Sequence, residues 1–355
     1  MPDIEFSVLR NTQQLQEFVP LWSALWKADV YATPFQHPAW LLPWWQQFGQ
    51  PDLRAIVLRR QGRPIGLLPL YLYSGPEPGA PRKLLALGAG TADYLDGIFA
   101  PGCTVAHVRQ AFELLAAEDT WNTLDILQLR PGSLLARALA ETPGVRAIES
   151  LSCSRGPARS ISELPVKIRR NAMYYRNRAM RRGSLTLTYA GPKGLAQTFE
   201  ELARMHTARW QQAGEPGVLT DERVLAWHRE ALPQLERAGL LRLCTLRLDD
   251  TVLGILYSLA DPARRHRTGP ATDEEKISPD GRTQYFYLTA YSPDCADLRP
   301  GTLLLALAIE QAAAEGFHTI DMLRGEETYK HLWHLEAAPT LGFRLPHPRR
   351  LASAA

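Results

Sequence analysis

The chain has 355 residues, of which 45% are hydrophobic and 22% are charged, and its net charge is +3. This composition is ordinary for a globular protein, the length predicts two domains of common size, and the small net charge identifies no partner by itself. No apolar run reaches the roughly 20 residues that a membrane-spanning helix needs.

The four cysteines, Cys103, Cys153, Cys244 and Cys295, lie far apart and form no CxxC or metal-ligand spacing. A reduced, cytoplasmic protein is therefore expected. The first ten residues have no basic-then-apolar signal pattern, so any contact with a membrane would be peripheral, on its inner face. The nine histidines form no HExxH pattern and no GxSxG occurs, so neither a metal site nor a nucleophilic triad is predicted.

The first half of the chain alternates between period-2 and helical patterns. Residues 88–97, GAGTADYLDG, form a glycine-flanked loop that carries Asp93 and Asp96. Residues 41–48 are rich in tryptophan, which favours a core or interface helix over the lining of an acyl or sugar pocket. The predicted strands are 4–9, 54–59, 65–72, 83–88 and 123–129, and the predicted helices are 12–28, 41–48 and 105–117.

Residues 167–182, KIRRNAMYYRNRAMRR, hold seven basic residues and no acid. Pro165 and Gly183 are start and stop signals for a helix here. Two interpretations stay open. The helix is either a solvated connector or a surface that binds the phosphates of a cofactor, a nucleotide-linked substrate, a lipid headgroup or RNA.

In the second half, Pro300-Gly301-Thr302 predicts a helix start, with Thr302 as its cap and Gly316 after its last turn. A glycine turn that opens a helix is an anion site, because free N–H groups and the helix dipole converge there. Residues 260–282 are rich in Pro and Gly and predict a mobile hairpin tip. The other predicted elements are strands 185–189, 284–291 and 319–323, and helices 193–211 and 221–236.

The two halves of the sequence match in order. Residues 53–59 resemble residues 241–247, and residues 65–68 resemble 253–256 at equal spacing. Further on, both halves contain a Pro-Gly turn, at residues 101–102 and 300–301, followed by a helix and a strand with one acid. The acid is Asp125 in the first half and Asp321 in the second. We therefore predict a duplicated α/β unit, and a repeated structural bond for the repeated acid.

Several segments together resemble the GNAT acyltransferases, and in particular the tandem GNAT proteins of the CelD-like and FemAB-like group, whose domain is called BioF2-like acetyltransferase. The resemblance covers most of residues 30–335. The segments that carry it are FQHPAW (35–40), GLLPL (66–70), ADYLD (92–96), the basic run 167–182, ARW (208–210), PGTLL (300–304) and DMLRGEETYK (321–330).

The resemblance implies two tandem GNAT-like domains, each a mixed, mostly antiparallel sheet flanked by helices. We expect them at residues 1–160 and 185–355, joined by a basic helix at 161–184. It also implies direct transfer of an acyl group from acyl-coenzyme A to an amine or hydroxyl acceptor in the cleft between the domains, without a tightly bound cofactor. Ordinary GNATs carry a [Q/R]xxGx[G/A] loop, whereas residues 297–302 here have one glycine and a proline.

Acyl transfer needs a base for the attacking group, a donor for the oxyanion and a proton or positive field for the leaving thiolate. Backbone N–H groups of a splayed strand can serve the oxyanion. The candidate residues follow from strand ends, glycine loops and helix starts. The catalytic candidates are Asp93, Asp96, Glu326 and Tyr329, the cofactor-binding candidates are Arg299, Gly301, Thr302 and Leu303, and the substrate-binding candidates are His206, Arg209, Trp210, Arg324 and Lys330.

Two other functions fit the sequence. The basic run 167–182 suits a FemAB-like transferase that takes its acyl group from aminoacyl-tRNA, which predicts salt-dependent RNA binding. A non-catalytic accessory protein of polysaccharide or envelope assembly would keep the fold without turnover.

Overall fold

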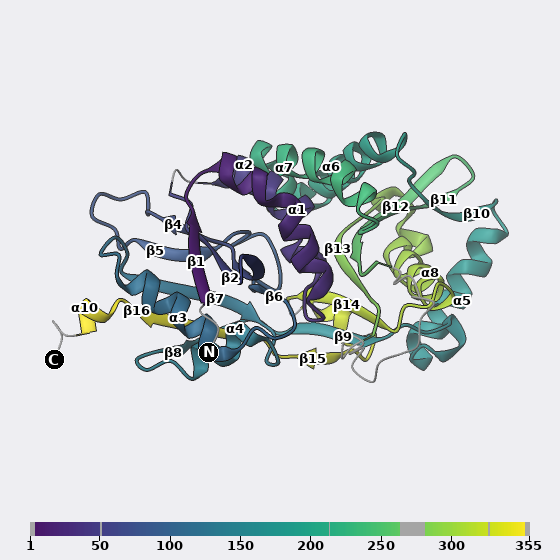
Figure 1. Ribbon diagram of the computed structural model, residues 1–355. Helices are drawn as coiled ribbons and strands as arrows, with labels where there is room; N and C mark the ends of the chain where they lie inside the picture. Colours follow the sequence, from purple (N-terminus) through teal and green to yellow (C-terminus); the bar gives the residue numbers. More distant parts are fainter. Residues whose placement is uncertain (1–3, 50–51, 213, 263–280, 326, 352–355) are drawn as a thin grey trace. The chain divides into compact units, whose positions relative to one another are not determined.

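The computed structural model describes residues 4–49, 52–212, 214–262, 281–325 and 327–351 (Figure 1). Contacts between residues divide the chain into two units. The first comprises Met1–Ser152 and Pro339–Ala355, and the second comprises Cys153–Ala338. Most of the predicted hairpin tip, residues 263–280, lies outside the described residues.

The first unit contains two sheets. One has the order β1 (Ile4–Leu9), β2 (Ala55–Arg60), β3 (Arg63–Leu68), β6 (Ile98–Phe99). The other has the order β4 (Leu70–Tyr73), β5 (Lys83–Ala86), β7 (Thr123–Leu129), β16 (Leu341–Pro346), β8 (Arg146–Ile148). The helices of this unit are α1 (Thr12–Ala28), the 3-10 turn η1 (Pro34–Gln36), α2 (Pro38–Phe48), α3 (Val105–Ala116), α4 (Leu134–Ala140) and α10 (Pro348–Leu351).

The tryptophan-rich segment of the first unit is core. Trp40, Trp44 and Trp45 on α2 are all buried. The helix begins at Pro38, where the His37 ring accepts a hydrogen bond from the Ala39 N–H at 3.1 Å. That acceptor role needs a neutral imidazole, and burial lowers the pKa of His37 to about 4.

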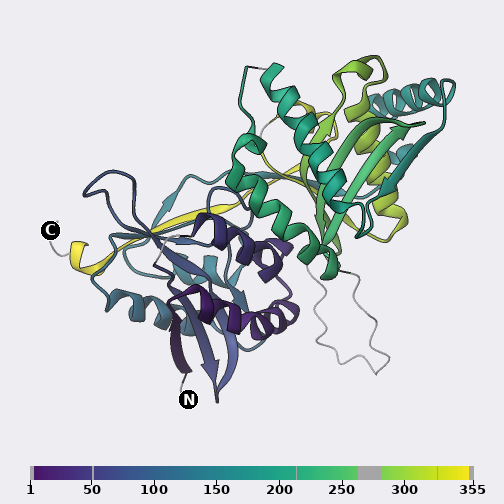
Figure 2. The same ribbon diagram turned by 90° about the horizontal axis from the view of Figure 1, so that it is seen from above.

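The second unit is built on one seven-stranded sheet with the order β10 (Leu185–Tyr189), β11 (Leu241–Leu248), β12 (Thr251–Ala260), β13 (Thr283–Tyr291), β14 (Thr319–Arg324), β9 (Cys153–Pro157), β15 (Glu336–Ala338). Helices α6 and α7 cover one face, and α5 and α8 cover the other (Figures 1 and 2). The helical segments are η2 (Ile161–Glu163), α5 (Val166–Met180), α6 (Leu195–Gln212), η3 (Val218–Thr220), α7 (Glu222–Arg237), η4 (Pro293–Leu298), α8 (Pro300–Ala314) and α9 (Thr328–His331).

Helix α8 is the centre of the core in the second unit, and most of its residues are buried. It lies close to the sheet because Gly254 has no side chain: a Cβ there would lie 3.2 Å from Leu304 and 3.0 Å from the Ala290 carbonyl. The sequence pattern predicted Thr302 as the cap of this helix, and this prediction is wrong. The cap is Arg299, whose backbone is left-handed with φ 48°, because Pro300 fits the first helical position.

The duplication predicted from the sequence is visible in the strand register. Leu58 of β2 pairs with Gly66 of β3, and Leu246 of β11 pairs with Gly254 of β12. Each hairpin carries an irregularity directly after that leucine. Each unit also contains one parallel pair of strands, β5 with β7 and β13 with β14.

The two units differ at the strand that follows this hairpin. In the second unit β13 pairs with β12 from Gln284 to Tyr291, with a bulge near Tyr287. In the first unit the same pairing is divided between β5, which pairs with β4, and β6, which pairs with β3. Residues 87–97 leave the sheet between β5 and β6, so the loop with Asp93 and Asp96 is an insertion into a strand.

Each unit also contains a strand from the other half of the sequence. β9 follows the first half but lies between β14 and β15, and β16 follows the second half but lies between β7 and β8. From the sequence, boundaries were expected at residues 160 and 184. The units divide at 152/153 and at 338/339 instead, because these two strands are exchanged. Helix α5, expected to be a connector, packs on α8 within the second unit.

Asp125 and Asp321 form the repeated structural bond that the sequence predicted. Asp125 of β7 lies opposite Arg344 of β16 and accepts two hydrogen bonds from its guanidinium, at 2.8 and 2.7 Å. Asp321 of β14 lies opposite Arg155 of β9, with 3.1 Å between Nε and Oδ2. Both acids are therefore held by an arginine on an exchanged strand.

We expect Arg155→Gln to destabilise the protein by about 3–5 kcal/mol, because it leaves the buried Asp321 carboxylate without its cation. Arg344→Gln should cost about 1 kcal/mol, since 41% of the Arg344 side chain is exposed and Lys83 remains 3.8 Å from Asp125. Urea unfolding of the two matched variants measures this difference. Equal losses would contradict the assignment of the Asp321 pair as the stronger constraint.

Candidate active site

The strands β13 and β14 separate after three paired residues. They are parallel neighbours from Thr283 to Tyr285 on β13 and from Thr319 to Asp321 on β14. Beyond that point β13 continues to Tyr291 with β12 on one side, and no described strand pairs with its other edge. β14 continues with a register shift against β9. The result is an open strand edge, with the bulge in β13 at the start of the opening.

The start of α8 lies at the end of this open edge. A Cβ on Gly301 would lie 3.3 Å from the ring of Tyr291, the last residue of β13. Pro300 has no N–H, and the N–H groups of Thr302 and Leu303 both bond to the Arg299 carbonyl, at 3.0 and 3.2 Å. Among the residues that the structure describes, Gly301 alone in this turn keeps an N–H without a backbone partner. The backbone anion site is thus smaller than the sequence suggested.

Side-chain cations surround the start of α8. Asp297, just before the helix, accepts hydrogen bonds from Arg178 at 2.9 Å and from Arg182 at 2.6 Å. Two guanidinium groups against one carboxylate leave a positive excess next to Arg299. Leu303, predicted to bind a cofactor, is instead buried in the hydrophobic core of the unit, where its side chain cannot reach a ligand.

Three of the predicted substrate residues lie together at the end of α6. The Arg209 guanidinium lies over the Tyr291 ring at 4.5 Å and over the Trp210 ring at 5.8 Å. The Trp210 indole N–H donates to Nε2 of His206 at 3.0 Å. Burial, and then the charge of Arg209, lower the pKa of His206 to about 4. His206 is therefore neutral at pH 7, and it orients Trp210 rather than serving as a base.

Tyr329 lies close enough to the same cluster to feel its charges. Burial, and next the Glu327 carboxylate, raise its pKa to about 12, while Arg209 opposes the rise. The residue is still 40% exposed. A phenol with this pKa holds its proton far more tightly than a thiol, whose usual pKa is near 8.5. Tyr329 is therefore suited to donate a hydrogen bond to a thiolate and is a poor proton source for it.

Lys330 fastens the loop that follows β14. Its ammonium donates to the carbonyls of Leu323, Arg324 and Gly325 at 3.3, 2.8 and 3.4 Å. It also pairs with Glu327 at 2.9 Å. Only 3% of the residue is exposed, so its contacts are structural and do not reach a substrate in this conformation. Arg324 is half-buried at the start of this loop, and Glu326 lies outside the described residues.

In the first unit, Asp96 is a buried carboxyl with an unusual pKa. Its Oδ1 accepts from the Gly97 N–H at 2.7 Å, and its carboxylate also accepts from the Ser133 hydroxyl. Burial is the main cause that raises its pKa to about 7, and the Asp29 charge adds to the rise, while Ser133 and Arg130 oppose it. Asp29 is held by the N–H groups of Tyr31 and Phe99, each at 2.8 Å.

The loop that carries Asp93 and Asp96 is supported by the FQHPAW segment. The Gln36 side-chain amide donates to the carbonyl of Tyr94, and the Phe35 ring lies 6.2 Å from the Tyr94 ring. Tyr94 itself is left-handed, with φ 54°, a conformation that a bulky residue keeps only when its surroundings fix it. Arg130 lies over Tyr94 at 5.8 Å. Asp93 is 3% exposed within this buried loop.

Sequence reasoning missed four residues of these clusters: Asp29, Arg130, Ser133 and Tyr291. Tyr291 had a signal, since it ends the aromatic strand segment QYFYLTAY. The other three are single polar residues at the ends of a helix, a strand and a turn, and their relation to Asp96 exists only in three dimensions.

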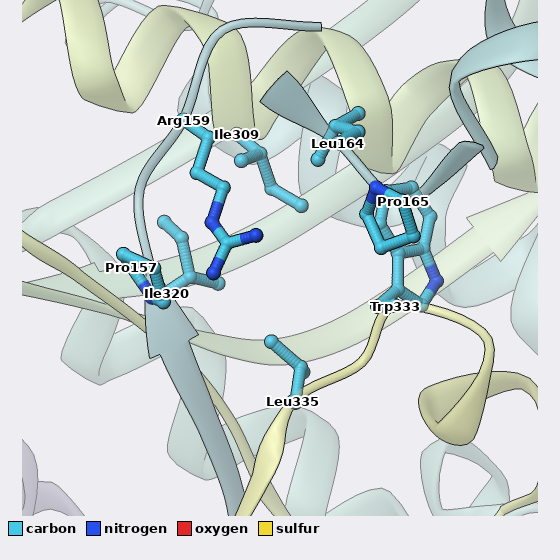
Figure 3. A pocket seen from close by; sticks show the side chains of 8 residues that line it. All are labelled: Pro157, Arg159, Leu164, Pro165, Ile309, Ile320, Trp333 and Leu335. Carbon is cyan, nitrogen blue, oxygen red and sulfur yellow. The ribbon is translucent and has the colours of Figure 1, made fainter.

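A small hollow in the second unit is not the active site. Its wall includes Ile320, Trp333 and Leu335, and the Arg159 side chain extends into it (Figure 3). It encloses about 10 Å³, which is room for roughly one water molecule. The described residues contain no group of His, Cys, Asp or Glu side chains arranged to hold a metal ion.

Residues 166–279 and 278–331 match the model of the acetyltransferase (GNAT) domain. The sequence has no significant match among curated proteins. Residues 166–331 therefore match the acetyltransferase (GNAT) domain over slightly less than half of the chain, and a domain of this kind implies transferase activity.

Solved structures share the fold along the whole chain. FemX is 12% identical with a TM-score of 0.64, and the match covers 99% of both chains. The C-terminal domain of a protein described as a lysylphosphatidylglycerol synthetase from Agrobacterium fabrum is 11% identical with a TM-score of 0.56, over 96% of this chain and 94% of that one. L-PGS from Bacillus licheniformis is 11% identical with a TM-score of 0.55, over 95% and 94%. At these identities the likeness shows the fold alone.

The raised pKa of Asp96 predicts a pH dependence of stability. The folded protein holds the Asp96 proton up to about pH 7, whereas an unfolded aspartate releases it near pH 4. The native state thus binds more protons between these values, and stability falls as the pH rises from about 4 to about 7. The free energy of unfolding of the wild-type protein should therefore be lower at pH 7.5 than at pH 5. Asp96→Asn should reduce this difference by about a few kcal/mol, as measured by urea unfolding at both pH values. An identical pH dependence in the variant would contradict the raised pKa.

Proposed function

We propose that the protein is an acyl-coenzyme A-dependent N- or O-acyltransferase that transfers the acyl group directly, without a covalent enzyme intermediate. The observation that carries the proposal is the separation of β13 from β14 with the start of α8 at its end. An open strand edge supplies backbone N–H and C=O groups to an extended amide chain, as in strand addition. The start of α8 and its arginines suit a phosphate group.

In this proposal the second unit binds the donor. The pyrophosphate contacts the Gly301 N–H and Arg299, with Arg178 and Arg182 supplying positive charge. The amide-containing arm of the donor lies along β13 toward the bulge near Tyr287. The backbone N–H groups there stabilise the oxyanion that forms when the acceptor nitrogen or oxygen attacks the thioester carbon.

The electron pair of the carbon–sulfur bond then moves to sulfur. Tyr329 donates a hydrogen bond to the departing thiolate, and the positive field of Arg209 acts in the same direction. The proton that the acceptor loses needs a base that is partly ionised near neutral pH. Among the predicted catalytic residues, Asp96 has this property, because its pKa is about 7. Asp93, in the same loop, remains a candidate for the same step.

Aminoacyl-tRNA is the second candidate donor. The observation that favours it is the basic helix α5, on which Lys167, Arg170 and Arg181 are exposed. Such a donor also carries phosphates and an activated carbonyl group, so the same strand edge and arginines would serve it. Its binding would weaken steeply with salt.

Coenzyme A should raise the unfolding midpoint of the wild-type protein, because a ligand at about 100 times its Kd stabilises the folded state by roughly 2.7 kcal/mol. Gly301→Val should lose most of this shift, since its side chain would press on the Tyr291 ring. Gly191→Val is the matched control, because a Cβ at Gly191 meets nothing within 4 Å. Thermal unfolding with coenzyme A and acetyl-coenzyme A provides the measurement.

If millimolar coenzyme A and acetyl-coenzyme A shift neither protein, the donor proposal fails. If coenzyme A shifts the unfolding midpoint of Gly301→Val as much as that of the wild type, the ligand does not bind at the start of α8. tRNA binding that is lost at high salt, together with no coenzyme A shift, would favour the second donor.

Asp96→Asn should lower kcat by about 10²- to 10⁴-fold with little change in KM for the donor, because the base is lost and the shape of the side chain is kept. In the wild-type protein kcat should rise as the pH passes through about 7, because Asp96 loses its proton there. The variant should not show this rise. The assay is thiol release from acetyl-coenzyme A with primary amine acceptors. Asp125→Asn is the control, because Asp125 is a buried acid with a structural partner. This control should keep the rise in kcat with pH. A variant with an unchanged pH profile would exclude Asp96 as the base.

A further inference from the structure

The exposed side of helix α5 combines apolar and basic residues in a regular pattern. Val166, Arg170, Met173, Asn177 and Met180 recur every three or four residues, and Lys167, Tyr174 and Arg181 form the neighbouring row. We name these eight residues the α5 stripe. Its large apolar members are among the most exposed in the chain: Val166 is 61%, Met173 51%, Tyr174 54% and Met180 56% exposed.

The opposite side of α5 is fixed to the unit. Ile168, Ala172 and Ala179 are buried in the core that α8 organises. The stripe is therefore held outward by packing, and rotation of the helix cannot hide its apolar side chains. Removal of large apolar side chains from water is favourable, so the exposure of four of them on one short helix is costly unless something covers them.

The basic residues of α5 fall into two groups. Arg178 and Arg182 pair with Asp297, Arg176 pairs with Glu310, and Arg169 donates to the Ser162 carbonyl. These four contribute to the packing of α5 on its own unit.

The cations of the stripe are different. Lys167, Arg170 and Arg181 are exposed, and within the described ranges of the chain none of them has an ion pair or a side-chain hydrogen bond. No acid occurs on the helix. The three charges therefore remain available to a partner outside the unit, and that partner must be negatively charged.

We propose that the α5 stripe docks this protein on the surface of an anionic lipid bilayer. A helix that lies in the headgroup region needs aliphatic side chains that enter the acyl boundary and cations that reach lipid phosphates. Long basic side chains can extend to the headgroups while their stems cover apolar surface. The 15 residues of α5 span about 22 Å, so three cations and four apolar side chains meet the surface together.

The composition of the stripe favours lipid over nucleic acid. Phosphates of RNA need cations and, for single strands, flat rings on which bases stack. Three of the four large apolar residues of the stripe, Val166, Met173 and Met180, are aliphatic and offer no such ring. They add nothing to RNA binding, whereas at a bilayer each contributes buried area. This inference is independent of the proposed acyl donor, because the vesicle assay needs no turnover.

The test is co-sedimentation of the full chain with vesicles of phosphatidylcholine alone and of phosphatidylcholine with about 30% phosphatidylglycerol. The wild-type protein should bind the anionic vesicles and not the neutral ones. The triple variant Lys167→Gln, Arg170→Gln, Arg181→Gln should bind on the order of 100-fold more weakly, since each basic residue near an anionic surface contributes roughly a fivefold factor. The triple variant Val166→Ser, Met173→Ser, Met180→Ser should lose at least about 10-fold.

Matched controls change equal numbers of exposed residues elsewhere. Arg63→Gln, Lys193→Gln, Arg237→Gln removes three exposed charges, and Leu21→Ser, Leu151→Ser, Val218→Ser removes three exposed apolar side chains. Both control proteins should bind as the wild type does. All changed side chains are exposed, and unfolding midpoints verify that each variant folds.

Two results would overturn the proposal. One is wild-type binding to anionic vesicles no stronger than to neutral ones. The other is binding that the apolar variant leaves unchanged, which would mark the stripe as a general polyanion surface. Binding to tRNA at physiological salt by both the wild type and the apolar variant, without vesicle binding, would identify RNA as the partner instead.

Discussion

The two exchanged strands are the constraint on which the rest of the structure depends. β9 and β16 complete sheets that begin in the other half of the sequence, and each carries the arginine that neutralises an acid of the neighbouring strand. A slip of one residue would turn Arg155 to the opposite face of the sheet and leave Asp321 buried without its cation. The ion pairs therefore fix the register of the strands next to β14 and β7. Since β14 borders the open edge of β13, the same pair also fixes the position of the candidate donor site.

The duplicated units have diverged at one place, the strand after the shared hairpin. In the second unit this strand is continuous, bulged and open on one edge. In the first unit residues 87–97 interrupt it, and within them residues 92–96 are buried. An extended ligand cannot lie where a packed loop already fills the position. The fold thus leaves one strand edge open, and the other copy of that position holds a buried carboxyl.

Most single elements could be predicted from the sequence, because they depend on local pattern. The strand at residues 123–129 and the helix at residues 12–28 were predicted with the observed bounds. The predicted strand at residues 65–72 is two strands, because Pro69 cannot donate to the ladder and the chain passes from one sheet to the other there. The exchange of β9 and β16 could not be predicted, since short strands such as CSRGP carry no signal for the partner they choose.

The candidate site shows the same division. Strand and helix ends were identifiable from the sequence pattern, and Arg209, Tyr329 and Gly301 lie near Tyr291. Their roles at a site stay predictions. Lys330 and Leu303 were predicted to contact ligands, but Lys330 binds carbonyls of its own loop and Leu303 lies in the hydrophobic core. Charge and spacing in the sequence do not tell which way a side chain faces. The partners of Asp96 come from three separate elements, so its pKa depended on packing that no motif records.

Proton transfer connects these observations. Acyl transfer to an amine near pH 7 needs a group that is partly ionised there, and the second unit offers none among its described candidates. His206 is neutral with a pKa of about 4, Tyr329 keeps its proton up to a pKa of about 12, and Lys330 is bound to carbonyls. Asp96, with a pKa of about 7, has the required value, and its value is a consequence of the inserted loop that buries it next to Asp29. The divergence of the two copies therefore separates the chemistry. One copy keeps the open strand edge to which the proposed function assigns the donor, and the other copy of that position holds a buried carboxyl with a pKa of about 7.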